Sequence, residues 1–142
     1  MGKKHHGDAP LTIVRTEDIP LREVSGVCLR RGSGGVMQIV AIGDGAAIGA
    51  WAEIPDDPSG PLAWETSPLT GLAGTRIPAK DAQIEAVCAD GEGRVLLLQE
   101  SPARIELVDP SNRRVVASIE LRVPDGHAAP VDDLVPYLDR LA

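Results

Sequence analysis

A short segment of this chain occurs twice. Residues 24–29 read VSGVCL and residues 84–89 read IEAVCA, so apolar side chains recur at the same offsets and a cysteine, Cys28 or Cys88, recurs at the same place. Each copy is followed by a glycine-containing turn and then by apolar runs with strand-like alternation. Repeats of this kind are units that cannot bury their apolar faces alone and must pack on one another. The repeat therefore predicts stacked or radially arranged β-units, which constrains the architecture more than the activity.

Composition also favours an all-β chain. The 142 residues are enough for one domain with a sizeable core. With no Phe, one Tyr and two Trp, the core must be built from aliphatic side chains, and the branched ones among them favour strands. The 15 glycines and 12 prolines indicate many turns and few long helices. The formal net charge of −7 argues against a nucleic-acid partner, because that role needs a basic face.

The expected strands fall into two units. The first unit is predicted over residues 21–82, with strands at 24–30, 36–42, 46–54 and 62–66. The second unit is predicted over residues 83–123, with strands at 84–89, 94–99, 104–108 and 114–123. Alternation in the last strand places Val115, Ala117, Ile119 and Leu121 on one face. Each unit is therefore expected to be a four-stranded antiparallel sheet of the kind found in propeller blades.

The two ends of the chain follow a different pattern. Residues 1–20 are expected to form a loose arm with an edge strand. Residues 124–142 are expected to form a loop and a short C-terminal helix, because Leu134, Leu138 and Leu141 are spaced three and four residues apart. That helix could cap an exposed sheet or dock on a partner.

The cysteines and the apolar runs indicate where the protein resides. Two cysteines do not make a disulfide framework, and both are expected to be small buried hydrophobes in a reducing compartment. The basic N-terminus lacks the apolar stretch of a signal peptide, and no run has the length of a membrane span. The sequence therefore predicts a cytoplasmic protein without a membrane partner.

The repeats also resemble a known family. EVSGV at residues 23–27 is similar to the strand opening E-L-S-G-[IL] of the esterase-like phytases, and IEAV at residues 84–87 is similar to their [LI]-E-G-[IVL] opening, with Ala86 in place of the usual glycine. Residues 93–105 look like the hairpin that follows in such a blade, related in style to the gluconolactonase and strictosidine-synthase propellers. The resemblance implies a β-propeller over residues 20–123. Closed propellers have about four to eight blades, so the two seen here imply a shortened relative, a truncated remnant, or a ring completed by several copies.

The resemblance also implies a site. In a propeller blade the start of the innermost strand lies beside the end of the next strand, which places Glu85 near Glu100 and Ser25 near Asp44. Phytase-like propellers hold a phosphoester with such acids and Ca²⁺, and attack by a metal-polarised water follows. The four residues are therefore candidate ligand-binding residues, and the three acids are candidate metal ligands. The competing interpretation is that these acids only stabilise turns, and no basic cluster backs them as a phosphate clamp would.

Two functions remain open at this point. The first is a partial β-propeller acting as a binding or self-assembly module without demonstrable catalytic machinery, either as a homo-oligomer or with a second chain that completes the propeller. The alternative is a reduced, phytase-like, Ca²⁺-dependent phosphoesterase or esterase. We favour the first, because two isolated blades would leave strand edges and apolar surface exposed.

Overall fold

Two β-sheets account for the regular structure. The structure is a computed structural model in which residues 13, 15–43, 47–57, 59–71, 77, 83–100 and 103–121 are described. Within them the elements are, in chain order, β1 (Val24–Arg31), the short 3-10 helix η1 (Ser33–Gly35), β2 (Met37–Gly43), β3 (Ile48–Glu53), β4 (Glu65–Pro68), β5 (Ile84–Ala89), β6 (Val95–Gln99), β7 (Arg104–Asp109) and β8 (Arg114–Glu120).

The sheet order follows the chain order. The first sheet has the order β1-β2-β3-β4 and the second has the order β5-β6-β7-β8, with every neighbouring pair antiparallel. The predicted all-β class with two four-stranded antiparallel units is confirmed. The described part of the chain contains no α-helix. The helix predicted within residues 124–142 and most of the arm predicted over residues 1–20 lie outside the described residues.

The two sheets match each other strand by strand. When β1 pairs with β2 the ladder skips Ser25, and when β5 pairs with β6 it skips Glu85. Both are β-bulges at the same position of the repeat, where one extra residue bends the strand and increases its twist. Beyond the bulge, Cys28 and Cys88 occupy equivalent ladder positions. The sequence repeat is therefore a repeat of structure, including its irregularity.

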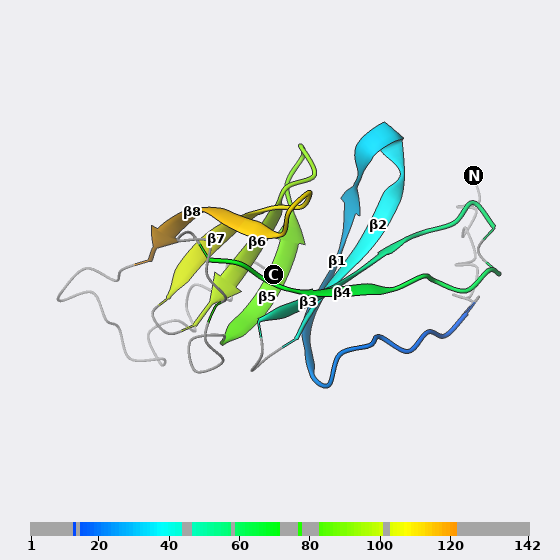
Figure 1. Ribbon diagram of the computed structural model, residues 1–142, viewed down its shortest axis with the longest axis horizontal. Coiled ribbons are helices and arrows are strands. Elements are labelled where there is room, and N and C mark those ends of the chain that lie inside the picture. Colours follow the sequence, from blue (N-terminus) through cyan, green and yellow to red (C-terminus); the bar gives the residue numbers. More distant parts are fainter. Residues whose placement is uncertain are drawn as a thin grey trace, which may run out of the picture.

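The sheets lie next to each other, with β1 beside β5 (Figure 1). Gly26 in β1 lies against Val87 in β5, and near the far end of β1 the Arg30 Nε donates a hydrogen bond of 2.7 Å to the Gly93 carbonyl oxygen. The two strands therefore run in the same direction along their seam. They belong to separate sheets, so side-chain packing and this hydrogen bond hold the seam rather than a β-ladder.

The core fills the space between the sheets. Its buried members come from β2 and β3 on one side, from β5 to β8 on the other, and from the connections Ala47, Leu69 and Ile77. The strand residues in this cluster are Val40, Ile42, Trp51, Ile84, Val95, Leu97, Val108 and Val115. Trp51 is 5% exposed and contributes the indole ring to this otherwise aliphatic core.

The connection after β4 also ties the sheets together. Thr70 forms an isolated parallel bridge with Arg114, donating from its amide to the Arg113 carbonyl at 3.1 Å and accepting from the Val115 amide at 2.7 Å. Neighbouring Leu69 is fully buried. Residues that leave the first sheet therefore pair with the last strand of the second sheet and cover part of its edge.

One predicted face and several strand boundaries are wrong. Val115 pairs with Val108, whereas Ala117 pairs with Leu107, so β8 contains a bulge at Val116. Because the bulge shifts the alternation by one residue, Val115 is buried in the core while Ala117 lies on the opposite face. The fourth strand, predicted at 62–66, occupies Glu65–Pro68. The strand predicted at 114–123 ends three residues earlier, at Glu120, the strand predicted at 84–89 has the observed bounds, and the others differ by one or two residues at their ends.

Candidate interaction surface

The contact inside the chain joins two different faces. We call forward the face of the first sheet that meets the second sheet, and rear the face of the second sheet that meets it. Cross-strand partners share a face. The forward face of the first sheet carries Gly26, Cys28, Val40, Ile42, Gly49, Trp51, Glu65 and Ser67. The rear face of the second sheet carries Val87, Ala89, Val95, Leu97, Glu106 and Val108. Because the sheets are equivalent, the contact is head-to-tail.

Two faces remain outside this contact. The forward face of the second sheet carries the charged pair Asp109 and Arg114 at one end and is otherwise uncharged, with Ala86, Cys88, Leu96, Leu98, Ile105, Leu107, Ala117 and Ile119. The rear face of the first sheet carries Val27, Leu29, Ile39, Ala41, Ala50 and Ala52. These two faces have the same positions in the repeat as the two faces that form the core.

Exposure separates the packed faces from the open ones. Ile42 is fully buried on the forward face of the first sheet, whereas Leu98, at the same position of the second sheet, is 38% exposed. Ile119 on the same open face is 63% exposed. On the rear face of the first sheet, Val27 and Leu29 are 50% and 57% exposed, although the centre of that face is buried. A contiguous apolar face of this kind marks an interaction surface more often than a solvated one.

Gly26 permits one of the close approaches in the seam between β1 and β5. A Cβ atom at Gly26 would lie 3.0 Å from both the amide nitrogen and the Cγ1 atom of Val87, and 3.4 Å from the Cα atom of Ala86. The strands approach this closely only because Gly26 has no side chain. The equivalent residue of the second sheet is Ala86, so the open forward face carries a methyl group at the point of closest approach.

Cys28 is enclosed by this seam, and its chemistry reflects that. The pKa of the Cys28 thiol is raised to about 11, first by burial and then by the nearby Cys88, while the charge of Arg30 opposes the shift. Cys28 packs against the core as predicted, but Cys88 is exposed, which corrects the expectation that both are buried. The reason is positional: Cys28 lies on the packed forward face and Cys88 on the open one. Neither forms a disulfide.

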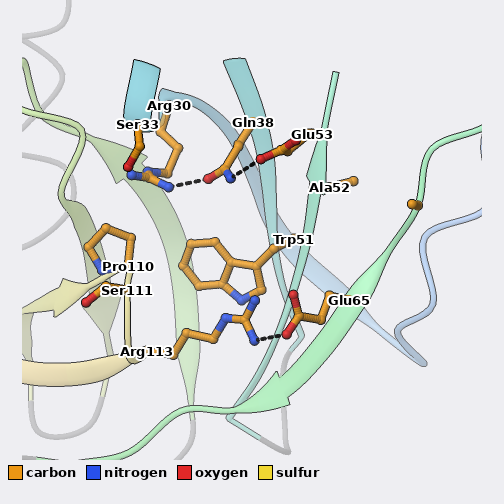
Figure 2. A pocket seen from close by; sticks show the side chains of 11 residues that line it. Arg30, Ser33, Gln38, Trp51, Ala52, Glu53, Glu65, Pro110, Ser111 and Arg113 are labelled. Atoms are coloured by element: carbon orange, nitrogen blue, oxygen red, sulfur yellow. Dashed lines mark hydrogen bonds and ion pairs between the residues drawn. The ribbon is translucent and has the colours of Figure 1, made fainter. Parts of the chain in front are cut away.

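The outer ends of the sheets are joined by Arg113. Its Nη1 donates hydrogen bonds of 2.9 Å to the Glu65 carboxylate and to the Ser67 hydroxyl, and its guanidinium lies 5.2 Å from the centroid of the Trp51 ring (Figure 2). The hydrogen bond from Arg113, and then its charge, lower the pKa of Glu65. The first and second sheets are thus connected at this edge by a cation–π contact and an ion pair.

A polar pocket of about 460 Å³ opens beside this joint (Figure 2). Arg30 donates to Gln38 on one wall, and Gln38 donates weakly to Glu53 at 3.5 Å. Trp51 and Arg113 form the facing wall. Arg30 and Arg113 each already have an acceptor within the protein, and Glu53 and Glu65 balance their charges. The pocket is therefore a polar joint between the sheets, in which the Trp51 Nε1 has no hydrogen-bond partner among the described residues.

Three of the four residues predicted as a site lie within the described residues, and two of them are at the same end of one sheet. Glu85 is the bulged residue of β5, and the Glu100 amide donates 2.9 Å to the Gln83 carbonyl, so the two acids lie at the same end of the second sheet and both are exposed. Ser25 is the equivalent bulged residue of β1, and its hydroxyl donates to the Ile42 carbonyl at 3.3 Å. Asp44 lies outside the described residues. The Ca²⁺ site over Asp44, Glu85 and Glu100 stays a prediction.

The described residues contain no group of three metal-ligating side chains placed to hold an ion. They also form no helix with the length and apolarity that crossing a bilayer requires.

Comparison of the chain with protein-family models, with curated proteins and with solved structures found no match.

Sequence reasoning missed the contacts that join the sheets. Nothing near Arg30 or Arg113 in the sequence indicates that one reaches the Gly93 carbonyl and the other covers a tryptophan ring. The sequence held one weak indication of how Trp51 is placed, which is the glycine two residues before it, Gly49. A Cβ atom there would lie 3.0 Å from the Trp51 Nε1, so the glycine makes room for the indole.

Proposed function

We propose that this chain is a sheet-packing interaction module: two blade-like units of an incomplete β-propeller, whose open forward face binds another β-sheet. The observation that carries the proposal is the contrast between equivalent positions, with Ile42 fully buried and Leu98 38% exposed. The resemblance to phytase-like propellers agrees with it, because blades in a propeller pack face to face in sequence. The proposal assigns the chain a binding role and no catalysis.

The parallel seam of β1 and β5 supports the blade interpretation. In a propeller the innermost strands of successive blades run side by side in the same direction, and the outer strands spread apart. In this chain the seam is tight at Gly26 and Val87, while the outer edges are separated by the polar pocket and joined through Arg113. This wedge-shaped arrangement favours a radial array over a flat stack.

The test uses two surface substitutions matched in exposure. Leu98→Glu places a charge on the open face, and Val36→Glu places one on the β1–β2 turn, where Val36 is 40% exposed. We expect light scattering to give a native mass above the chain's 14.9 kDa, which Leu98→Glu lowers and Val36→Glu leaves unchanged. If the chain alone is a monomer, we expect it to bind an apolar fluorescent dye, with binding lost in Leu98→Glu only.

Two results would contradict the proposal. One is an association that both variants leave unchanged. The other is a monomer that binds no dye, because its forward face would then offer no apolar surface. Far-ultraviolet circular dichroism of both variants checks that each remains folded.

A further inference from the structure

We infer that the sheet bound by the open forward face is the first sheet of a second copy of this chain, packed head-to-tail. This inference rests on the proposed function and names its partner. The chain itself supplies both halves of the contact. Inside the chain, the rear face of the second sheet packs on the forward face of the first sheet. The rear face of the first sheet has the same positions in the repeat, so in a second copy it could pack on the open forward face in the same way. On this rear face Val27 and Leu29 of β1 are 50% and 57% exposed, whereas the central residues Ala41, Ala50 and Ala52 are already buried within the chain. The second copy would therefore offer the β1 side of its rear face.

The residue correspondence predicts which atoms meet. Inside the chain, Gly26 lies against Val87, and Val87 corresponds in the repeat to Val27. Between copies, Ala86 of one chain should therefore lie against Val27 of the next. The Ala86 methyl group occupies space that is empty at Gly26, so the seam between copies is expected to be wider than the seam within the chain. Leu29 of the second copy then lies beside Cys88.

Charge is complementary at the hairpin end of this contact. Inside the chain, Arg30 at the end of β1 reaches the next hairpin at Gly93. In the second sheet the position of Arg30 is taken by Asp90, and Arg94 forms ion pairs with both Asp90 and the 74% exposed Glu92. These three side chains carry one net negative charge. The hairpin of the second copy would present Arg31, an exposed cation on the rear side of β1, and this opposite charge favours the orientation.

A head-to-tail contact has a consequence that a two-fold contact lacks. Each added copy again offers an open forward face, so association continues until the ring closes. With two sheets per chain, propellers of about four, six or eight blades correspond to closed dimers, trimers or tetramers. A forward-to-forward dimer would instead stop at two copies and place Cys88 against Cys88.

Thiol cross-linking of the full chain distinguishes these arrangements. All proteins carry Cys28→Ser, which leaves Cys88 as the native thiol. Leu29→Cys, where Leu29 is 57% exposed, adds a thiol on the rear face of β1, and Val116→Cys, where Val116 is 50% exposed on the outer strand β8, is the control. With a short bis-maleimide, we expect covalent dimers and higher oligomers for Leu29→Cys, and none of these products for Val116→Cys or for the parent protein.

Each other outcome overturns the inference. Cross-linked dimers in the parent protein would indicate forward-to-forward pairing through Cys88. Absence of cross-links in Leu29→Cys, from a protein whose mass shows an oligomer sensitive to Leu98→Glu, would mean that the open face binds a different surface. A monomer that binds the apolar dye through Leu98 would leave the proposed interaction module in place but exclude a second copy as its partner.

Discussion

Substituting Gly26 by alanine tests how closely the two sheets approach at their seam. The new Cβ atom would lie 3.0 Å from the Val87 amide nitrogen and Cγ1 atom. Optimal contacts between such atoms are about 3.5–4.0 Å, so β1 and β5 must separate by several tenths of an ångström. Because one of the two contacts is with backbone, a rotamer change at Val87 cannot relieve it.

The expected magnitude follows from two opposing effects. Overpacking a well-packed core costs about 1–3 kcal/mol. Replacing glycine in a strand recovers about 0.5–1 kcal/mol, because alanine has less conformational entropy to lose. Taking the middle of both ranges, we expect Gly26→Ala to lower the free energy of unfolding by about 1.3 kcal/mol, and the melting temperature by about 3–5 °C for a domain of this size.

The assay is urea unfolding followed by circular dichroism, comparing midpoints at equal slope. Gly91→Ala is the matched control, because a Cβ atom at Gly91 has nothing within 4 Å. The double variant Gly26→Ala, Val87→Ala should be less destabilised than the sum of its single variants, since removing Cγ1 relieves one of the two contacts. If Gly26→Ala is as stable as the native protein or Gly91→Ala, the seam is not tight and the reasoning is refuted.

The remaining predictions concern titratable groups in and near the core. Burial raises the pKa of Glu106, and the nearby Arg104 only partly opposes this shift. The contribution of this carboxyl to the free energy of unfolding is therefore greatest below the unfolded pKa of 4.5. It is lost as the pH rises through the raised pKa of the folded protein. We therefore expect Glu106→Gln to flatten the decline of stability between pH 4.5 and neutrality in urea titrations, and an unchanged slope would contradict the assignment. At pH 8 we expect a disulfide reagent to label exposed Cys88 faster than half-buried Cys28, because the pKa of the Cys28 thiol is raised to about 11 and only the thiolate reacts. Equal rates for the two thiols would show that the seam is open.

Much of the secondary structure could be predicted from local patterns, because it depends on alternation and on turn residues. The hairpin at Asp90 is an example: a turn is indicated by Asp90-Gly91 and Gly93, and the Asp90 carboxylate accepts from the Glu92 and Arg94 amides. The positive φ of 79° lies at Gly93 and not in the Asp-Gly pair. The extra residue at Val116 could not be predicted, because a bulge leaves the apolar pattern intact while reversing the faces beyond it.

The open face of the second sheet was harder to predict from the sequence than the strands. Both faces of the second sheet are apolar, so the pattern alone cannot say that Leu97 is buried and its neighbour Leu98 exposed. That distinction depends on which face of one sheet meets the other, and this is set by contacts between residues far apart in the chain, such as Gly26 with Val87. The repeat indicated that the units pack together, but not that they do so head-to-tail.

The bridge between Thr70 and Arg114 has a consequence for biosynthesis. Ribosomes add about 5–20 residues per second, so the connection carrying Thr70 emerges several seconds before the strand with which it pairs. Until then Leu69, fully buried in the finished protein, lacks its final surroundings. The first sheet can form its hairpins during translation, but the core between the sheets cannot close until β8 has left the exit tunnel. A nascent chain stalled before residue 114 should therefore be the species most dependent on chaperones.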